Sequence, residues 1–292
     1  QTRSPSRIIV VDNASADESC TGLGDHYPHV TLIRSETNLG FAAANNLAVK
    51  QAADCDWIAL LNPDARAEPS WLEELLSAAL RQSEYAFFGC RMLLADTPQL
   101  LDGVGDAYHV TGLVWREAHG EKGQGAHLVP REIFSPCGAA ALYRRDAFLD
   151  ADGFDERYFC YVEDVDLGFR LRLLGYRCLY VPNAVVHHKG SAITGKYSDF
   201  SIYHGHRNIA WTFIKDFPSP WIWIALPGHM LMTIIVVVIF MLRGQATVIV
   251  RAKYHAALGI PAMWRSRKHV QARRRVQAMK IISLMRFSLR RK

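Results

Sequence analysis

The chain has six cysteines in 292 residues, and no two of them form a C-x-x-C pair. Closely spaced cysteine pairs are the usual ligands of structural zinc, so their lack argues against a zinc knuckle. Six widely scattered cysteines also give no disulfide framework, and reduced thiols in a cytosolic compartment are the plain interpretation. The sequence contains no internal repeat and no low-complexity tract.

Acidic side chains are missing from the C-terminal segment. Residues 243–292 hold 14 of the 34 Lys and Arg residues and none of the 28 Asp and Glu residues. The first 242 residues therefore carry 20 basic against 28 acidic side chains, a net charge of −8. A basic tail on an acidic body fits anionic lipid or nucleic acid. The tail has no base-stacking or groove-reading motif, so we expect membrane lipids and no nucleic acid.

Charged side chains are also missing from Trp221–Leu242, which is long enough to span a bilayer. One crossing would separate the basic tail from an Asp-rich cytosolic body, although positive charge near membrane segments stays cytoplasmic. A re-entrant hairpin bent at Pro227-Gly228 or a helix lying in the interface avoids this conflict. A single span and a buried core helix remain alternatives. We expect residues 217–292 to form a hydrophobic membrane-associated segment with a basic tail.

Short apolar runs alternate with helical patterns along the first 90 residues. We predict strands at Ile8–Val11, Val30–Ile33, Trp57–Leu61 and Tyr85–Cys90, and helices at Phe41–Ala53 and Ser70–Arg81. This alternation predicts an α/β fold with a parallel, doubly wound sheet. Ligands bind beyond the carboxyl ends of the strands in such sheets. Asp12 and Asp64 stand at two of these ends, so one cleft is expected to present both.

The later part of the body is less regular. Residues 95–135 are Gly-rich, contain Asp102, Asp106 and His109, and predict a hairpin or a flexible rim. Further strands are expected at Phe134–Tyr143 and Arg177–Val181. A helix at Ser201–Ile214 then presents three side chains on one face: His204, Arg207 and Trp211. We expect residues 1–216 to form one domain.

The segment between those two strands carries three carboxylates within four residues: Glu163, Asp164 and Asp166. They begin a predicted helix whose apolar stripe is Leu167, Leu171 and Leu174 and whose end is Gly175. Crowded like charges beside aromatic rings raise the pKa of a carboxylate, which suits a general base near neutral pH. Acidic residues in a first turn also stabilise the helix dipole, so a structural cap remains the alternative.

Seven motifs occur in order along residues 7–215: VVDNAS, NLGFAAANN, LLNPDA, FSPCGAAALYRR, GFDERYFCYVEDVDLGFRLRLLGY, VVHHKGS and YHGHRN. Together they resemble glycosyltransferase family 2, most closely its bacterial rhamnosyltransferase-like members. The resemblance implies a GT-A-type fold with a Rossmann-like, mostly parallel sheet. It implies an inverting transfer from a nucleoside-diphosphate sugar such as dTDP-L-rhamnose to a cell-surface or lipid-linked glycan. It also places the protein at the cytoplasmic face of the bacterial cell membrane.

The resemblance assigns the two catalytic carboxylates. Asp164 would take the proton from the acceptor hydroxyl, and Glu163 would orient the acceptor, whereas Asp166 caps the helix or pairs with an Arg. The implied donor-binding residues are Asp12, for the nucleotide base, and Asn38, Gly40, Asn62, Asp64 and Arg207. An Asx-turn at Asp12, a turn-forming role for Gly40 and a solvated or membrane-facing side chain for Arg207 remain alternatives.

Asn62-Pro63-Asp64 stands where the family carries its D-x-D metal motif. Hard oxygen ligands holding Mg²⁺ or Mn²⁺ there neutralise the diphosphate and help it to leave. Asn62 departs from the motif and leaves Asp64 as its only charged ligand. The resemblance implies that His188 completes the metal shell, while the adjacent His187 should face the opposite way. A simple strand-end turn at Asn62–Asp64 remains the alternative.

Family members begin with one more strand and helix before the position that matches Gln1. A sheet without that strand exposes backbone hydrogen-bonding groups along its neighbour, so we expect the chain as given to be poorly active or unstable. The rival to an enzyme is a non-catalytic, membrane-bound descendant of the same fold that acts as a binding or scaffold protein.

Overall fold

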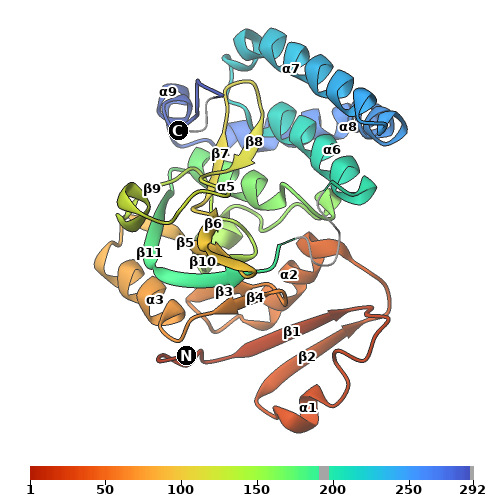
Figure 1. Cartoon of the computed structure of the whole chain (residues 1–292). Helices are drawn as coiled ribbons and strands as arrows, with labels where there is room; N and C mark the ends of the chain where they lie inside the picture. Colours follow the sequence, from red (N-terminus) through yellow and green to blue (C-terminus); the bar gives the residue numbers. More distant parts are fainter. Residues whose placement is uncertain (191–196, 290–292) are drawn as a thin grey trace.

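The computed structural model describes residues 1–190 and 197–289, and its centre is one mixed β-sheet (Figure 1). The sheet has seven strands, with β3, β10, β5, β11 and β4 in spatial order, β6 paired with β5 and β9 paired with β11. Their bounds are β3 Trp57–Leu61, β4 Ala65–Ala67, β5 Tyr85–Leu94, β6 Thr97–Gly103, β9 Arg131–Glu132, β10 Ala140–Arg144 and β11 Arg177–His188. Helices cover both faces, which confirms the α/β class.

The sheet is not the parallel sheet that the alternation predicted. Strand β11 is parallel to β5, but β10 lies between β3 and β5 and runs antiparallel to both. The chain between β5 and β10 folds into hairpins, β5 with β6 and β7 (Asp106–Tyr108) with β8 (Val114–Arg116), instead of a crossover helix. Without a crossover the chain re-enters the sheet in the opposite direction. The expected hairpin in residues 95–135 is thereby confirmed.

Two core layers hold the sheet. On one face, α3 (Trp71–Arg81) buries an apolar stripe that starts at Trp71 and Leu72 and continues through Leu75 to Ala78 and Ala79. On the other face pack α2 (Gly40–Gln51), α4 (Arg145–Asp150) and α5 (Glu163–Leu173). The predicted stripe of α5, Leu167, Leu171 and Leu174, is buried in this second layer.

The N-terminal strands form a separate pair. Strand β1 (Ile8–Asn13) is parallel to β2 (Val30–Ser35), and the short helix α1 (Leu23–His26) connects them. Within the described residues, β1 pairs with β2 alone and β3 pairs with β10 alone. Figure 1 shows this pair at the end of the molecule away from the C-terminal helices.

The chain ends in four helices: α6 (Asp199–Asp216), α7 (Ile222–Leu242), α8 (Ala246–Ala272) and α9 (Ala278–Ile282). Of the two arrangements considered for this segment, the hairpin bent at Pro227-Gly228 is wrong, because α7 continues as one helix through Pro227. The helix contacts the body on both sides of this proline, at the buried Ile222 and at His229, whose Nδ1 lies 2.8 Å from the Thr111 carbonyl oxygen. Two single turns of 3₁₀ helix, Gly125–Leu128 and Glu156–Tyr158, complete the elements. The division of the chain at residue 216 stays a prediction.

Candidate active site

The segment that enters β10 connects two of the predicted acidic positions. Ala139 accepts a hydrogen bond at 2.8 Å from the backbone N–H of Asn62, in the turn after β3. The next residue back, Gly138, donates its N–H to Asp164 Oδ2 at 2.8 Å, and Ser135 Oγ donates to the Asp164 carbonyl at 3.0 Å. The turn that carries Asp64 and the start of α5 therefore both contact the same short segment, residues 135–139.

His188 at the end of β11 lies between two carboxylates. Its Nε2 is 3.4 Å from Asp64 Oδ1, and its Nδ1 is 2.9 Å from Asp102 Oδ2 on β6. The pairing of β4 with β11 places the residue after Asp64 opposite His188. His187 faces the other way and its Nε2 lies 3.0 Å from Glu68, which confirms the predicted alternation. The last residue of the VVHHKGS motif lies outside the described residues.

This arrangement fits a divalent cation. A metal-binding histidine usually places its second ring nitrogen against a carboxylate, as His188 does with Asp102, and oxygen from Asp64 suits Mg²⁺ or Mn²⁺. The described part of the chain contains no cluster of three or more His, Cys, Asp or Glu side chains that could hold a metal ion. Asp64 and His188 would thus be the two protein ligands, and donor oxygens and water would fill the remaining positions.

A row of hydrogen-bonded charged side chains extends from His188 into the protein. Asp102 also accepts from Arg116 Nη1 at 2.8 Å, and Arg116 Nε donates to Asp106 Oδ1 at 3.0 Å. Burial acts to raise the pKa of Asp102, but Arg116 and His188 outweigh it and lower this pKa to about 2. Asp106 differs: burial dominates over Arg116 and, with the charge of Asp164 nearby, raises its pKa to about 7. Sequence reasoning noted both aspartates but assigned them no role.

The raised pKa expected of the acidic segment belongs to Glu163. This side chain is buried, and its Oε2 has no hydrogen-bond partner among the described residues. Burial, followed by the negative charge of Asp164, raises the pKa of Glu163 well above its ordinary value. Asp166 is a structural residue and pairs with Arg170 at 2.7 Å, as the sequence analysis allowed.

The loop before α5 is held in an unusual backbone conformation. Three non-glycine residues in it have positive φ, between 65° and 70°: Phe159, Tyr161 and Val162. Such angles are costly, above all for a β-branched residue. The buried side-chain amide of Asn208 on α6 donates to three carbonyl oxygens of this loop, those of Tyr158, Cys160 and Tyr161, at 2.9, 3.0 and 2.7 Å. Sequence reasoning missed Asn208, although it closes the YHGHRN motif.

Arg207 has partners other than the phosphate oxygens implied by the resemblance. Its guanidinium donates to the carbonyl oxygens of Arg157 and Tyr158 at 3.2 and 2.9 Å and stacks 4.3 Å from the Trp211 ring. The predicted common face with Trp211 is present, but it faces the body. Because its guanidinium binds backbone and ring, Arg207 supports the same loop as Asn208.

Asp12 stands next to Asn13 at the end of β1, and it is Asn13 that contacts Asn38 and Gly40 at the start of α2. Asp12 Oδ1 accepts from the Ser15 N–H at 3.0 Å, which is the Asx-turn alternative, and this hydrogen bond lowers its pKa. Asn38 Oδ1 accepts from Asn13 Nδ2 at 3.0 Å and from the Gly40 N–H at 2.9 Å. Gly40 has φ +78°, and a Cβ there would lie 2.5 Å from the ring and carbonyl of Phe159. These contacts give Gly40 a packing role at the loop before α5.

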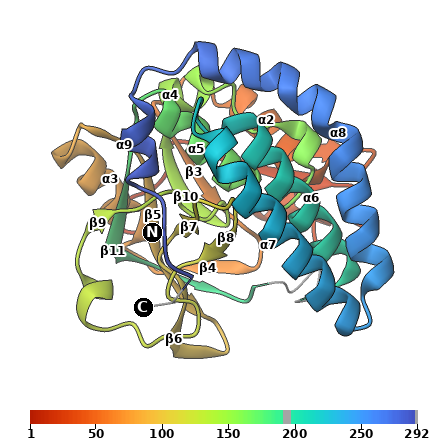
Figure 2. The same cartoon turned by 90° about the horizontal axis from the view of Figure 1, so that it is seen from above.

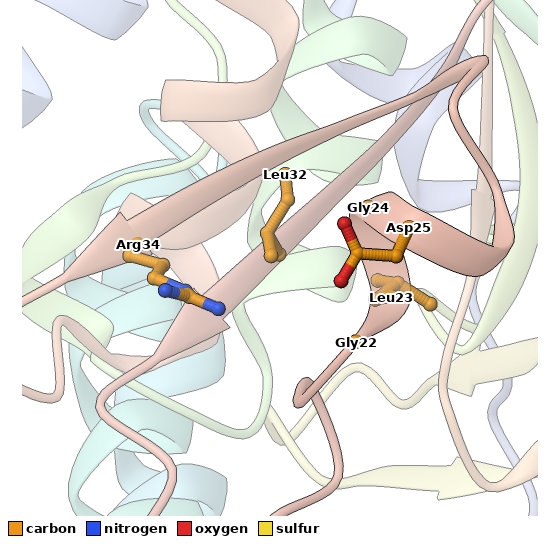
Figure 3. Close-up of a pocket in the computed structure, with 6 residues that line it drawn as sticks. All are labelled: Gly22, Leu23, Gly24, Asp25, Leu32 and Arg34. Atoms are coloured by element: carbon orange, nitrogen blue, oxygen red, sulfur yellow. The ribbon is translucent and has the colours of Figure 1, made fainter.

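A surface hollow of about 350 Å³ lies beside β2 and α1 (Figure 3). Its lining is Gly22, Leu23, Gly24, Asp25, Leu32 and Arg34. Figure 3 shows the side chains of Arg34 and Asp25 on either side of Leu32. Arg34 of this lining is the register partner, across β1 and β2, of Asp12, the residue that the resemblance assigns to the nucleotide base.

Two relatives share much of this sequence. N-acetylglucosaminyl-diphospho-decaprenol L-rhamnosyltransferase of Mycobacterium tuberculosis is 32% identical over 243 residues, which cover 75% of this chain and 78% of that protein. Rhamnosyltransferase WbbL of Escherichia coli is 29% identical over 198 residues, which cover 60% of this chain and 70% of that protein.

Two solved structures have the same fold. GalNAc-T7 with UDP, GalNAc and Mn²⁺ superposes with a TM-score of 0.58 at 15% identity and covers 74% of this chain and 44% of its own. The mannosyltransferase PcManGT of Pyrobaculum calidifontis, in complex with GDP-Man and Mn²⁺, gives a TM-score of 0.51 at 14% identity over 91% of this chain and 76% of its own.

The family model for Glycosyl transferase family 2 matches residues 1–151. The chain therefore belongs to glycosyltransferase family 2, as a transferase of GT-A fold similar to the bacterial rhamnosyltransferases.

Proposed function

We propose that this glycosyltransferase moves L-rhamnose, with inversion, from dTDP-L-rhamnose to a hydroxyl group of a lipid-linked glycan at the cytoplasmic face of the bacterial membrane. The observation that carries the proposal is the fixed carboxylate of Asp164, held by the Gly138 N–H one residue from the contact with the Asn62–Asp64 turn. The rhamnose donor and the lipid-linked acceptor are taken from what the rhamnosyltransferase relatives are named for.

In this proposal Asp164 is the general base. As the acceptor oxygen attacks the anomeric carbon, its proton passes to Asp164, the new carbon–oxygen bond forms, and the bond to the diphosphate breaks on the opposite face. Asp64 and His188 would hold a Mg²⁺ or Mn²⁺ ion that neutralises the leaving diphosphate. Asp102 keeps the His188 ring oriented with Nε2 toward Asp64.

Glu163 would position the acceptor. Burial and the charge of Asp164 raise its pKa and so favour the protonated carboxyl, which can donate a hydrogen bond as well as accept one. Its Oε2 has no hydrogen-bond partner among the described residues, although the side chain is buried. Asp12 would accept from the nucleotide base with the oxygen that does not bind the Ser15 N–H, beside the hollow at Arg34.

The competing proposal is a non-catalytic descendant that binds membrane and partner proteins. Asn62 in place of a metal-binding carboxylate and the two-residue metal site favour it.

A donor screen on membranes that contain the protein separates the glycosyltransferase from the non-catalytic descendant. We expect nucleoside diphosphate release from dTDP-L-rhamnose that requires a lipid-linked acceptor and stops with chelator. No release with any sugar nucleotide would favour the non-catalytic protein, and release with another donor alone would correct the sugar.

A further inference from the structure

Helix α7 exposes an apolar surface to solvent along most of its length. Within the described residues it is the one helix long and apolar enough to cross a membrane, and 6% of its most apolar window is buried. Its exposed large side chains are Trp223, Ile224, Met230, Leu231, Ile234, Ile235, Val238, Ile239, Met241 and Leu242. An exposed apolar face of this size marks an interaction site.

The opposite side of α7 touches the body at its start, its middle and its end. Ile222 is buried at the start and Phe240 at the end, where its ring lies 4.9 Å from His206 on α6. In between, His229 Nδ1 lies 2.8 Å from the carbonyl oxygen of Thr111, and its ring stacks on Phe213 at 4.0 Å. The stretch from Ile222 to Phe240 is about 27 Å long at the usual helical rise. The helix thus lies along the catalytic body, beside α6 in both views (Figures 1 and 2).

The chain after α7 returns to the same body. Helix α8 packs along α6, and Trp211 Nε1 donates to the Ala256 carbonyl at 3.1 Å. Beyond α8, Ile281, Ile282 and Met285 are buried in one cluster with the side chains of β7, α5 and α6. The Arg286 N–H donates to the Tyr108 carbonyl at 2.8 Å. A single crossing by α7 would put these residues on the far side of the membrane and break every one of these contacts.

Helix α8 continues the apolar surface of α7. Its exposed large apolar side chains are Val250, Tyr254, Leu258, Ile260 and Trp264. Trp223 of α7 and Trp264 of α8 lie with ring centroids 5.8 Å apart, so the two rows adjoin there. Trp and Tyr are the side chains that favour the headgroup region of a bilayer. We call the exposed apolar side chains of α7 and α8 the outer face.

The charge of this region selects the partner. No Asp or Glu follows Asp216 in the sequence, whereas four exposed basic residues belong to or border the two helices: Arg243, Arg251, Arg265 and Lys268. A second copy of the chain on this face would bring positive charge against positive charge. An anionic lipid surface complements both the apolar side chains and the basic ones.

We propose that the outer face binds an anionic bilayer with α7 parallel to the membrane plane, so that the protein enters one leaflet and does not cross it. This deepens the proposed membrane location and rests on it. It resolves the conflict between a long apolar segment and a basic tail, because the tail stays on the cytoplasmic side together with the catalytic body. A lipid-linked acceptor would then meet the enzyme in the leaflet on which the enzyme lies.

Vesicle binding of the full chain tests the surface. We compare co-sedimentation with phosphatidylcholine vesicles and with vesicles that also contain phosphatidylglycerol, for wild type and Ile234→Glu/Val238→Glu. These side chains are 60% and 47% exposed, so the change leaves the core intact. The matched control is Leu80→Glu/Leu149→Glu on α3 and α4, where the exposed fractions are 69% and 47%.

We expect wild type and the control to bind the phosphatidylglycerol vesicles, and the outer-face variant to bind about tenfold less or worse at an unchanged melting temperature. Binding by the outer-face variant equal to that of wild type would refute the proposal that the outer face binds the bilayer. So would a concentration-dependent dimer of wild type that the variant loses while neither binds vesicles.

A C-terminal epitope tag tests the in-plane orientation. We expect antibody or protease to reach the tag in inverted membrane vesicles and not in intact spheroplasts, and alkaline carbonate to extract the protein. A tag reached from outside spheroplasts, or resistance to carbonate, would mean a crossing helix and refute the orientation. Sugar transfer is assayed separately. Wild type that transfers sugar but does not bind vesicles defeats this inference alone, and wild type that binds vesicles but transfers no sugar defeats the proposed function alone.

Discussion

Gly138 donates its backbone N–H to Asp164 Oδ2 at 2.8 Å, so main chain rather than a flexible side chain sets the direction of this carboxylate. The other carboxylate oxygen accepts from the Val165 N–H at 2.8 Å. A Cβ at position 138 would lie 3.2 Å from the Asp164 Cβ, a tight contact that a side chain there could relieve only by a small shift. A base held by backbone in this way needs little reorganisation before it takes a proton.

We expect Asp164→Asn to lower sugar transfer by on the order of 10²–10⁴-fold, because the amide accepts from Gly138 but takes no proton. Nucleoside diphosphate release measures the change. Asp146→Asn is the matched control: Asp146 is the second residue of α4, as Asp164 is of α5, and it also accepts from the next backbone N–H. Wild-type turnover by Asp164→Asn would remove this residue from the base role.

Asn208→Ala tests the support of the loop before α5. The three hydrogen bonds from Asn208 to the loop carbonyl oxygens hold the loop backbone at positive φ, and without them the loop can relax to other angles. We therefore expect kcat to fall while the KM for the donor changes little. Asn46→Ala is the control, since Asn46 also makes three hydrogen bonds to the chain between α4 and α5, at Phe154 and Glu156. Both changes should cost about 1–3 kcal/mol of the free energy of unfolding, measured in urea. Equal losses of kcat in both variants would make Asn208 merely structural.

Asp102→Asn tests the orientation of His188. We expect Mn²⁺ to bind about 10- to 100-fold more weakly in isothermal titration, because the ring loses the carboxylate that fixes it. The chain provides a matched control in Glu68→Gln, which removes the carboxylate partner of His187 on the opposite side of the strand. Unchanged Mn²⁺ affinity in Asp102→Asn, or the same loss in both variants, would contradict a metal site at Asp64 and His188.

Glu163 makes the stability of the fold depend on pH. Its native pKa is raised, so above pH 4.5 the unfolded state releases a proton that the native state keeps. The free energy of unfolding must therefore fall as pH rises, by up to about 1.4 kcal/mol per pH unit, until the native pKa is reached. We expect Glu163→Gln to remove this slope and to stabilise the protein at neutral and alkaline pH in urea titrations.

The exposed Glu84→Gln is the control for that pH dependence and should keep the wild-type slope. If Glu163→Gln and wild type lose stability in parallel between pH 5 and pH 8, the proton is not held by Glu163. Asp106, whose pKa is also raised, would then be the next group to replace.

The sequence by itself determined the local elements and the family. Strand β3 has the predicted bounds Trp57–Leu61, and α5 buries the stripe read from its leucine spacing, because period and residue type decide such elements locally. The order of the motifs was enough to indicate glycosyltransferase family 2. It also placed Asp64 and His188 together, although their roles remain proposals.

Tertiary structure decided the relationships that depend on the path of the chain. The reversed direction of β10 follows from the hairpins before it, and no pattern within β10 encodes it. Asp102 meets His188, and Asn208 meets the loop at Tyr161, only because distant strands and helices pack side by side. The apolar run of α7 predicted a membrane segment, but its position along the body is decided by the contact of His229 with Thr111 and by the return of the chain to the body. Local periodicity sets the type of an element, whereas its neighbours and its direction come from long-range packing.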